Sequence, residues 1–170
     1  MDPIWRTIIW QQFGAAIDML ENAMHACPDD LWSDRSQRLE FWYVVYHTLF
    51  WLDLYLSGAV EDFAPPTPFT LDELDPAGLL PERPYTKAEL QAYLDHDRQK
   101  CRSTLAALTD EQAQRLCEFS WGKAISFAEL LLDNMRHVQY HAAELNVILG
   151  DKTGSAPSWV TKTKSGLSVE

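Results

Sequence analysis

Three histidines have a spacing that could support metal chemistry. His137 and His141 lie four positions apart in HVQYHAAELNVILG, residues 137–150, and His47 lies in FWYVVYHTLFWLDLYL, residues 41–56. An α-helix turns by about 100° per residue, so positions four apart differ by about 40° and share one face. Because apolar residues continue the same faces, we expect all three side chains to point into the protein interior.

Three buried imidazoles favour a metal ion. Each neutral ring offers one donor and one acceptor, so His47, His137 and His141 would satisfy one another poorly. A divalent cation accepts a lone pair from each ring, and three protein nitrogens with an open fourth position are typical of catalytic zinc. The alternative stays open, because paired histidines without the glutamate of HExxH also occur in ordinary helical cores. We expect His25 and His96 at the surface.

The elements that would position these histidines are helical patterns, and no segment reads convincingly as a strand. Asp2 and Pro3 have the residue types that begin a helix, and Pro28 ends it. A second helix is predicted over about residues 36–56. It is apolar almost all the way round and stops at Gly58.

Later helices begin at capping boxes, in which a Ser or Thr and an acid or amide three residues later satisfy each other's backbone amides. The three candidates are TKAE at 86–89, TDEQ at 109–112 and SFAE at 126–129. The last helix is predicted to end at Gly150. These patterns predict an all-α four-helix bundle over residues 1–150. We expect residues 151–170 to form a polar C-terminal tail, with Trp159 and Val160 as a possible point at which it docks on the bundle.

The connection between the second and third long helices decides the predicted topology. Residues 58–85 contain six of the nine prolines, and a helix of this size spans ~30 Å. Only a long connection can carry the chain back so that the third helix starts parallel to the second. We therefore predict an up-down-down-up bundle with a long crossover. The connection is acidic and could be a lid or a dimer element, but we expect a solvated strap.

Composition argues against several classes of partner. The net charge of −11 disfavours nucleic acids and anionic membranes, because phosphate binding needs a positive field. Cys27, Cys101 and Cys117 are odd in number and lack CxxC spacing, so they read as reduced thiols. The first residues lack the features of a signal peptide, and residues 41–56 are too short for a transmembrane helix. We therefore expect a cytoplasmic protein with no membrane partner.

The segments YHTLFWLDLYL and NMRHVQYHAAELNVILG resemble the DinB/YfiT-like family of four-helix bundles. The resemblance spans essentially the whole chain, including the long second connection and PSWV near the C-terminus. It implies an up-down-down-up bundle and a divalent metal, commonly zinc or nickel, with His47, His137 and His141 as ligands. The chain departs from the family in one place. Many members have a basic-Gly-Gln run after the last histidine, where this chain reads AAE at 142–144.

Glu144, in that departing run, is the candidate catalytic residue. It lies about 20° from His137 on the helix and one turn beyond His141. It could accept a hydrogen bond that orients an imidazole, or act as a general base near a bound water. An ordinary half-exposed helix glutamate is an equally compatible interpretation. Asp133, one turn before His137, has a similar but weaker claim.

The resemblance also implies a reaction class with alternatives. Characterised relatives use a low-molecular-weight thiol, as thiol S-transferases and as a thiol-dependent maleylpyruvate isomerase. In such a mechanism the metal would bind the thiol and lower its pKa. The same open position could instead hold a metal-bound hydroxide, which would make the protein a hydrolase acting on a small molecule. A third alternative is a non-catalytic bundle that binds a metal or a small molecule, and a homodimer is compatible with all three.

Overall fold

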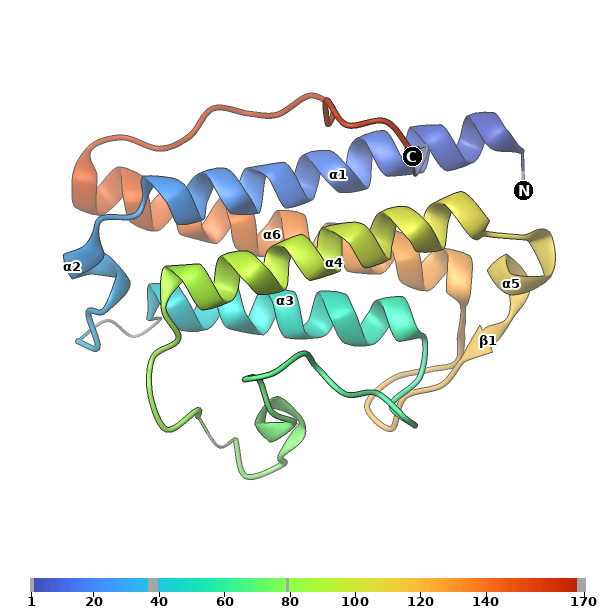
Figure 1. Ribbon diagram of the computed structural model, residues 1–170, viewed down its shortest axis with the longest axis horizontal. Coiled ribbons are helices and arrows are strands. Elements are labelled where there is room, and N and C mark those ends of the chain that lie inside the picture. Colours follow the sequence, from blue (N-terminus) through green and yellow to red (C-terminus); the bar gives the residue numbers. More distant parts are fainter. Residues whose placement is uncertain (1, 37–39, 79, 168–170) are drawn as a thin grey trace.

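Four long helices dominate the computed structural model, which describes residues 2–36, 40–78 and 80–167. They are α1 (Pro3–Ala26), α3 (Phe41–Ser57), α4 (Lys87–Ala107) and α6 (Phe127–Thr153). α1 and α3 each pack against both α4 and α6, so α1 lies across the bundle from α3. Figure 1 shows α3 and α4 running in one direction and α1 and α6 in the other. The predominantly helical fold expected from the sequence is confirmed.

The predicted N-terminal caps are present. The Asp2 carboxylate accepts a hydrogen bond from the Ile4 N–H at 2.7 Å, and Pro3 occupies the first turn of α1. Reciprocal capping boxes begin α4, the short α5 (Asp110–Gln114) and α6, and they join Thr86 with Glu89, Thr109 with Gln112, and Ser126 with Glu129. Local sequence therefore determines where these helices start.

The predicted start of the second long helix is wrong. α3 begins at Phe41 rather than near Ser36, and residues 37–39 of the predicted first turn lie outside the described part of the chain. The Asp34 carboxylate accepts hydrogen bonds from the backbone N–H of Ser36 at 2.9 Å and from its hydroxyl at 2.6 Å. Such a side-chain contact stabilises a turn, which competes with helix at this position.

The predicted end of α6 and the absence of strands are also wrong. α6 continues through Gly150 to Thr153, so the predicted boundary between bundle and tail falls inside the helix. The helix ends at Gly154, whose φ of 75° is the left-handed conformation that ends helices. Before α6, the short strands β1 (Leu116–Cys117) and β2 (Ile125–Ser126) pair in antiparallel fashion. Two residues are too few to show an alternating pattern in the sequence.

α3 is buried on most of its surface, as its apolar sequence predicts. Tyr46, Leu49 and Phe50 are fully buried, whereas the side chain of His47 is 30% exposed. The short helix α2 (Asp29–Trp32) fills the turn between α1 and α3. Within the described ranges, no helix is both long enough and apolar enough to span a bilayer. His47 therefore lies on a packed helix, near the rim of the core.

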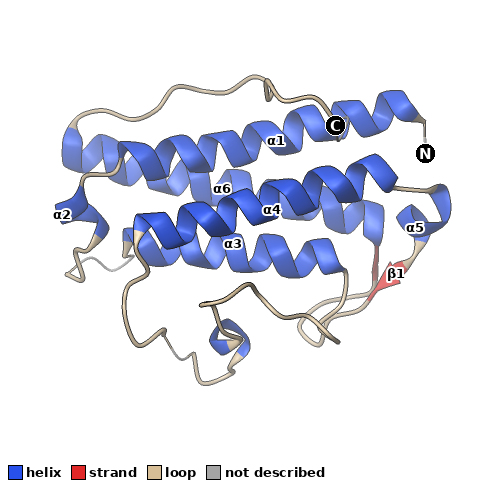
Figure 2. Ribbon diagram, viewed as in Figure 1, coloured by secondary structure: helices blue, strands red, loops and turns tan. Residues whose placement is uncertain are grey.

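The connection between α3 and α4, residues 58–86, is not the solvated strap expected from the sequence. Its side chains Phe63, Phe69 and Tyr85 are buried and belong to the main core. Figure 2 shows the connection as a largely irregular segment that contains one short helix, η1 (Asp72–Leu74). The connection thus covers the bundle and can place side chains near α3.

The segment after α6 packs along α1 (Figure 1). The N–H of Thr163 donates to a carbonyl of α1 at 3.0 Å, and the Trp10 indole donates to the carbonyl of Ser165 at 2.9 Å. Of the two residues expected to dock the tail, Val160 packs against the core as predicted. Trp159 remains exposed, so the prediction for this residue is wrong. The predicted polar tail is therefore a packed part of the fold up to residue 167.

Candidate metal centre

The three predicted histidines meet between α3 and α6, and we refer to His47, His137 and His141 as the three-histidine centre. Nε2 of His137 lies 3.4 Å from Nε2 of His47 and 3.1 Å from Nε2 of His141. The candidate ligand atoms of all three rings lie within 4.8 Å of one another. Packing of α3 against α6 places His47 opposite the pair that lies one helical turn apart. Nitrogens from two helices therefore face a common centre.

Carboxylates hold the outer nitrogens of two of these rings. Oε1 of Glu73 lies 2.5 Å from Nδ1 of His47, and Oε2 of Glu144 lies 2.6 Å from Nδ1 of His141. Because an ionised carboxylate only accepts hydrogen bonds, each ring keeps its proton on Nδ1 and turns the lone pair of Nε2 toward the centre. In metal sites, such carboxylate partners orient imidazole ligands and raise their basicity.

Sequence reasoning misses Glu73. This residue belongs to η1, and its side chain is only 6% exposed. Besides His47, it accepts hydrogen bonds from the Tyr43 hydroxyl at 3.0 Å and the Trp51 indole at 3.3 Å. Three donors on α3 therefore hold one carboxylate from the connection. The connection has no helical or alternating period that would orient an acid, and its apolar neighbour Leu74 is the one local sign of packing.

The two other acids proposed for the site behave differently. Glu144 reaches His141 directly, which is the geometry of an orienting acceptor. Asp133 is exposed and instead forms an ion pair with Arg136 at 3.3 Å on the outer side of α6. The structure thus brings Glu144 to the three-histidine centre and leaves Asp133 outside it.

Burial favours the neutral form of the imidazoles of His137 and His141. Burial, reinforced by the rings of His141 and His47, lowers the pKa of His137 to about 3. Burial also lowers the pKa of His141, although the hydrogen bond to Glu144 opposes this shift. The neutral ring is the form that can donate a lone pair to a cation, so the lowered pKa values of these two rings are compatible with a metal site.

The donor set fits a divalent transition metal. Two nitrogens bound to one zinc ion at about 2.0–2.1 Å in a tetrahedron lie about 3.3 Å apart. The Nε2 separations of 3.1 and 3.4 Å around His137 agree with this value. Without a cation or a proton between them, lone pairs would face one another in a poorly solvated place. Imidazole ligands suit zinc, nickel, copper and iron.

A family model described as the DinB superfamily matches residues 12–145, and this range contains all three histidines. The chain belongs to the DinB superfamily. This membership confirms the family resemblance inferred from the sequence. No curated protein and no solved structure matches the chain.

In this member of the DinB superfamily, aromatic rings border the three-histidine centre. Tyr43 and Trp51 contact His47 with ring centroids 6.3 and 6.2 Å away. Trp121, from the loop before β2, meets Trp51 edge-on at 5.2 Å and is itself about half exposed. The rim of the centre on the α3 side is therefore aromatic, and Trp121 forms its outer edge. The remaining histidines are exposed, as predicted.

Proposed function

We propose that this DinB superfamily chain binds one divalent metal ion, zinc or nickel, and acts as a low-molecular-weight-thiol S-transferase. The Nε2 atoms of His47, His137 and His141 would hold the ion. The observation that carries the proposal is the convergence of these three atoms, with carboxylates on the outer nitrogens of two rings. When bound, the ion would act as a Lewis acid that lowers the pKa of a thiol at its open position.

The protein's own residues orient the ligands and limit access by water. Glu73 and Glu144 keep the protons of His47 and His141 on Nδ1, so that Nε2 is always the free nitrogen. Tyr43 and Trp51 flank His47 and cover part of that side of the ring. A thiol substrate would approach from the more open side of the aromatic rim.

The state of the two carboxylates favours a thiol over water as the nucleophile. Among the described residues, Glu73 and Glu144 are the carboxylates that contact the histidines, and each is already the acceptor for an imidazole N–H. In each carboxylate, the oxygen that contacts the imidazole is therefore engaged, which is the arrangement of a residue that positions the ring. A zinc ion at the centre would lower the pKa of a bound water to about 7, whereas it would deprotonate a coordinating thiol outright, so thiolate would form more readily than hydroxide. We therefore assign Glu144 as a positioning residue.

The order and direction of the four long helices are part of the same proposal. We assign the bundle to the up-down-down-up class, with residues 58–86 as its long crossover. The assignment is supported by the shared direction of α3 and α4 in Figure 1. In this arrangement α3 lies beside α6, which the three-histidine centre requires.

A conjugation assay tests the proposed activity. The protein loaded with Zn²⁺ or Ni²⁺ is mixed with glutathione or another small thiol and with chlorodinitrobenzene, and thioether formation is followed. We expect metal-dependent turnover that is lost in His137→Ala and kept in His25→Ala, whose exposed side chain contacts Gln91. Metal-dependent hydrolysis of ester substrates without thiol transfer would favour the hydrolase. No turnover of either kind, with metal bound, would favour a binding protein.

A further inference from the structure

A second cluster of ligand-type side chains lies between α3 and α4. Candidate ligand atoms of Asp53, His96 and Asp97 all lie within 4.8 Å of one another. Asp53 is on α3, six residues beyond His47, whereas the other two are neighbours on α4. The cluster is therefore separate from the three-histidine centre and unites two helices that pack together.

Asp97 is the unusual member of this cluster. Its side chain is 0% exposed, and neither carboxylate oxygen has a hydrogen-bond partner among the described residues. An unpaired buried carboxylate is strongly unfavourable, because the desolvation of the charge is not compensated. Burial, followed by the nearby charge of Asp53, raises the pKa of Asp97 well above its usual range. The Asp97 carboxylate is thus a buried hydrogen-bond acceptor without a donor among the described residues.

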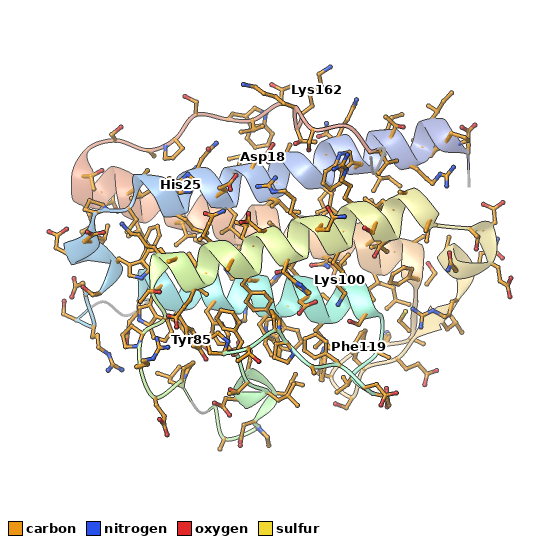
Figure 3. The ribbon with its side chains drawn as sticks, viewed as in Figure 1. Asp18, His25, Tyr85, Lys100, Phe119 and Lys162 are labelled. Carbon is orange, nitrogen blue, oxygen red and sulfur yellow. The ribbon has the colours of Figure 1, made fainter. Side chains whose placement is uncertain are left out.

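The other buried acid is already satisfied. Asp53, 1% exposed, accepts hydrogen bonds from the Tyr93 hydroxyl at 3.1 Å and the Lys100 ammonium at 2.5 Å. Lys100 also donates to the carbonyl of Asp53 at 3.0 Å and to the Ser57 hydroxyl at 2.7 Å. Figure 3 shows Lys100 on the part of α4 that faces α3. Of the two acids, the Lys100 ammonium thus bonds to Asp53 alone, and the Asp97 carboxylate has no hydrogen-bond partner among the described residues.

We propose that Asp53, His96 and Asp97 form a second divalent-cation site between α3 and α4. Two carboxylates and one imidazole are ligands that suit Mn²⁺, Fe²⁺ and Zn²⁺. The cation would supply the partner that Asp97 lacks. It would enter from the side of His96, whose side chain is 47% exposed.

Lys100 is the natural competitor for this cation. Its ammonium occupies one oxygen of Asp53, while His96 Nε2 lies 3.7 Å from the same oxygen. The Lys100 side chain is 29% exposed and has a long stem, so its ammonium can turn toward water when a cation binds. Removal of the lysine charge therefore strengthens cation binding at this site, which a purely structural ion pair would not do.

Mn²⁺ titration after zinc loading tests the second site. The protein first receives one equivalent of Zn²⁺ to fill the three-histidine centre, and free Mn²⁺ is then followed by electron paramagnetic resonance. We expect one Mn²⁺ bound per chain, with at least tenfold weaker binding in Asp97→Asn and in His96→Ala. We expect tighter binding in Lys100→Met. Asp95→Asn, an exposed acid on the same helix, is the matched control and should bind like wild type.

Several outcomes of this titration would contradict the second cation site. His96→Ala changes an exposed side chain, so this variant tests the site even where Asp97→Asn disturbs folding. If zinc-loaded wild-type protein binds no Mn²⁺, or if His96→Ala and Asp97→Asn bind it as wild type does, the proposal is wrong. Unchanged or weaker binding in Lys100→Met would also contradict it. Failure of zinc to occupy the three-histidine centre would be seen separately, as a zinc ligand shell without three imidazole nitrogens in X-ray absorption before Mn²⁺ is added.

Discussion

A hydrogen bond between Glu73 and His47 joins the long connection to α3, with 2.5 Å between Oε1 of Glu73 and Nδ1 of His47. The same carboxylate accepts hydrogen bonds from Tyr43 and Trp51, so it is fixed by three donors on one helix. A residue far from any metal-binding motif thereby sets the tautomer of a predicted ligand. If His47 binds a metal as proposed, we expect metal binding to depend on the position of the connection.

Replacement of Glu73 should weaken metal binding. We expect Glu73→Gln to lower the zinc affinity by about 10–100-fold, because the amide is a poorer acceptor for the His47 N–H. Competition with a fluorescent zinc chelator measures this change. Asp72→Asn, at the partly exposed neighbour in η1, is the control and should keep wild-type affinity. Equal affinities for Glu73→Gln and wild type would show that this hydrogen bond does not support the ligand.

Replacement of Glu144 distinguishes a positioning residue from a general base. We expect Glu144→Gln to lower zinc affinity by about 10–100-fold through His141, while thiol transfer at saturating zinc keeps its pH profile. Chelator competition and the pH dependence of turnover are the two measurements. A variant with normal zinc affinity, but with the acidic limb of its pH profile removed, would instead identify Glu144 as the base.

The sequence predicts the histidines well because they lie in periodic segments. His137 and His141 share a face by helical spacing alone, and His47 follows the apolar pattern of α3. Glu73 could not be predicted in the same way, because residues 58–86 have no period that assigns a face. The packed position of the connection depends on long-range contacts made by residues such as Phe69, which local sequence does not reveal.

Helix ends show the same division between local and long-range causes. The capping boxes can be predicted from the sequence because their two partners are three residues apart, as in Ser126 and Glu129. The end of α6 was predicted at Gly150, but the residue that adopts the left-handed conformation is Gly154. Two nearby glycines offer the same local signal, and the sequence alone does not choose between them.

Close packing of the C-terminal segment on α1 predicts sensitivity at Gly14. A Cβ at this position would lie 2.6 Å from Cγ2 and 2.8 Å from Cβ of Thr163. We expect Gly14→Ala to lower the free energy of unfolding by about 1–3 kcal/mol through overpacking. It should also raise hydrogen exchange over residues 155–167, as measured by mass spectrometry.

Gly150 supplies the matched control for that substitution. It lies inside α6, and a Cβ there would meet no atom within 4 Å. Gly150→Ala should therefore raise the free energy of unfolding by about 1 kcal/mol, because alanine has the higher helix propensity. If Gly14→Ala is as stable as Gly150→Ala and leaves exchange unchanged, the tail does not pack on α1 in solution.

The capping box of α4 predicts a defined pH dependence. Hydrogen bonds from Arg83 and from Thr86 lower the pKa of Glu89 from 4.5 to about 2. Since the folded-state pKa is depressed, the stabilisation is complete above about pH 4.5 and is lost as the pH falls toward 2. Wild type should therefore melt above Glu89→Gln at neutral pH, and the gap should close in that acidic window. A difference in Tm that stays constant from pH 7 to pH 2 would contradict this mechanism.

The most direct measurement is the ligand shell of zinc, read by X-ray absorption spectroscopy on the protein loaded with one equivalent of Zn²⁺. We expect three imidazole nitrogens at about 2.0–2.1 Å, and a loss of imidazole scattering in His141→Ala. His25→Ala should leave the spectrum unchanged, because that side chain lies at the surface. A shell dominated by carboxylate oxygens, or an unaltered spectrum in His141→Ala, would contradict the three-histidine centre as the metal site.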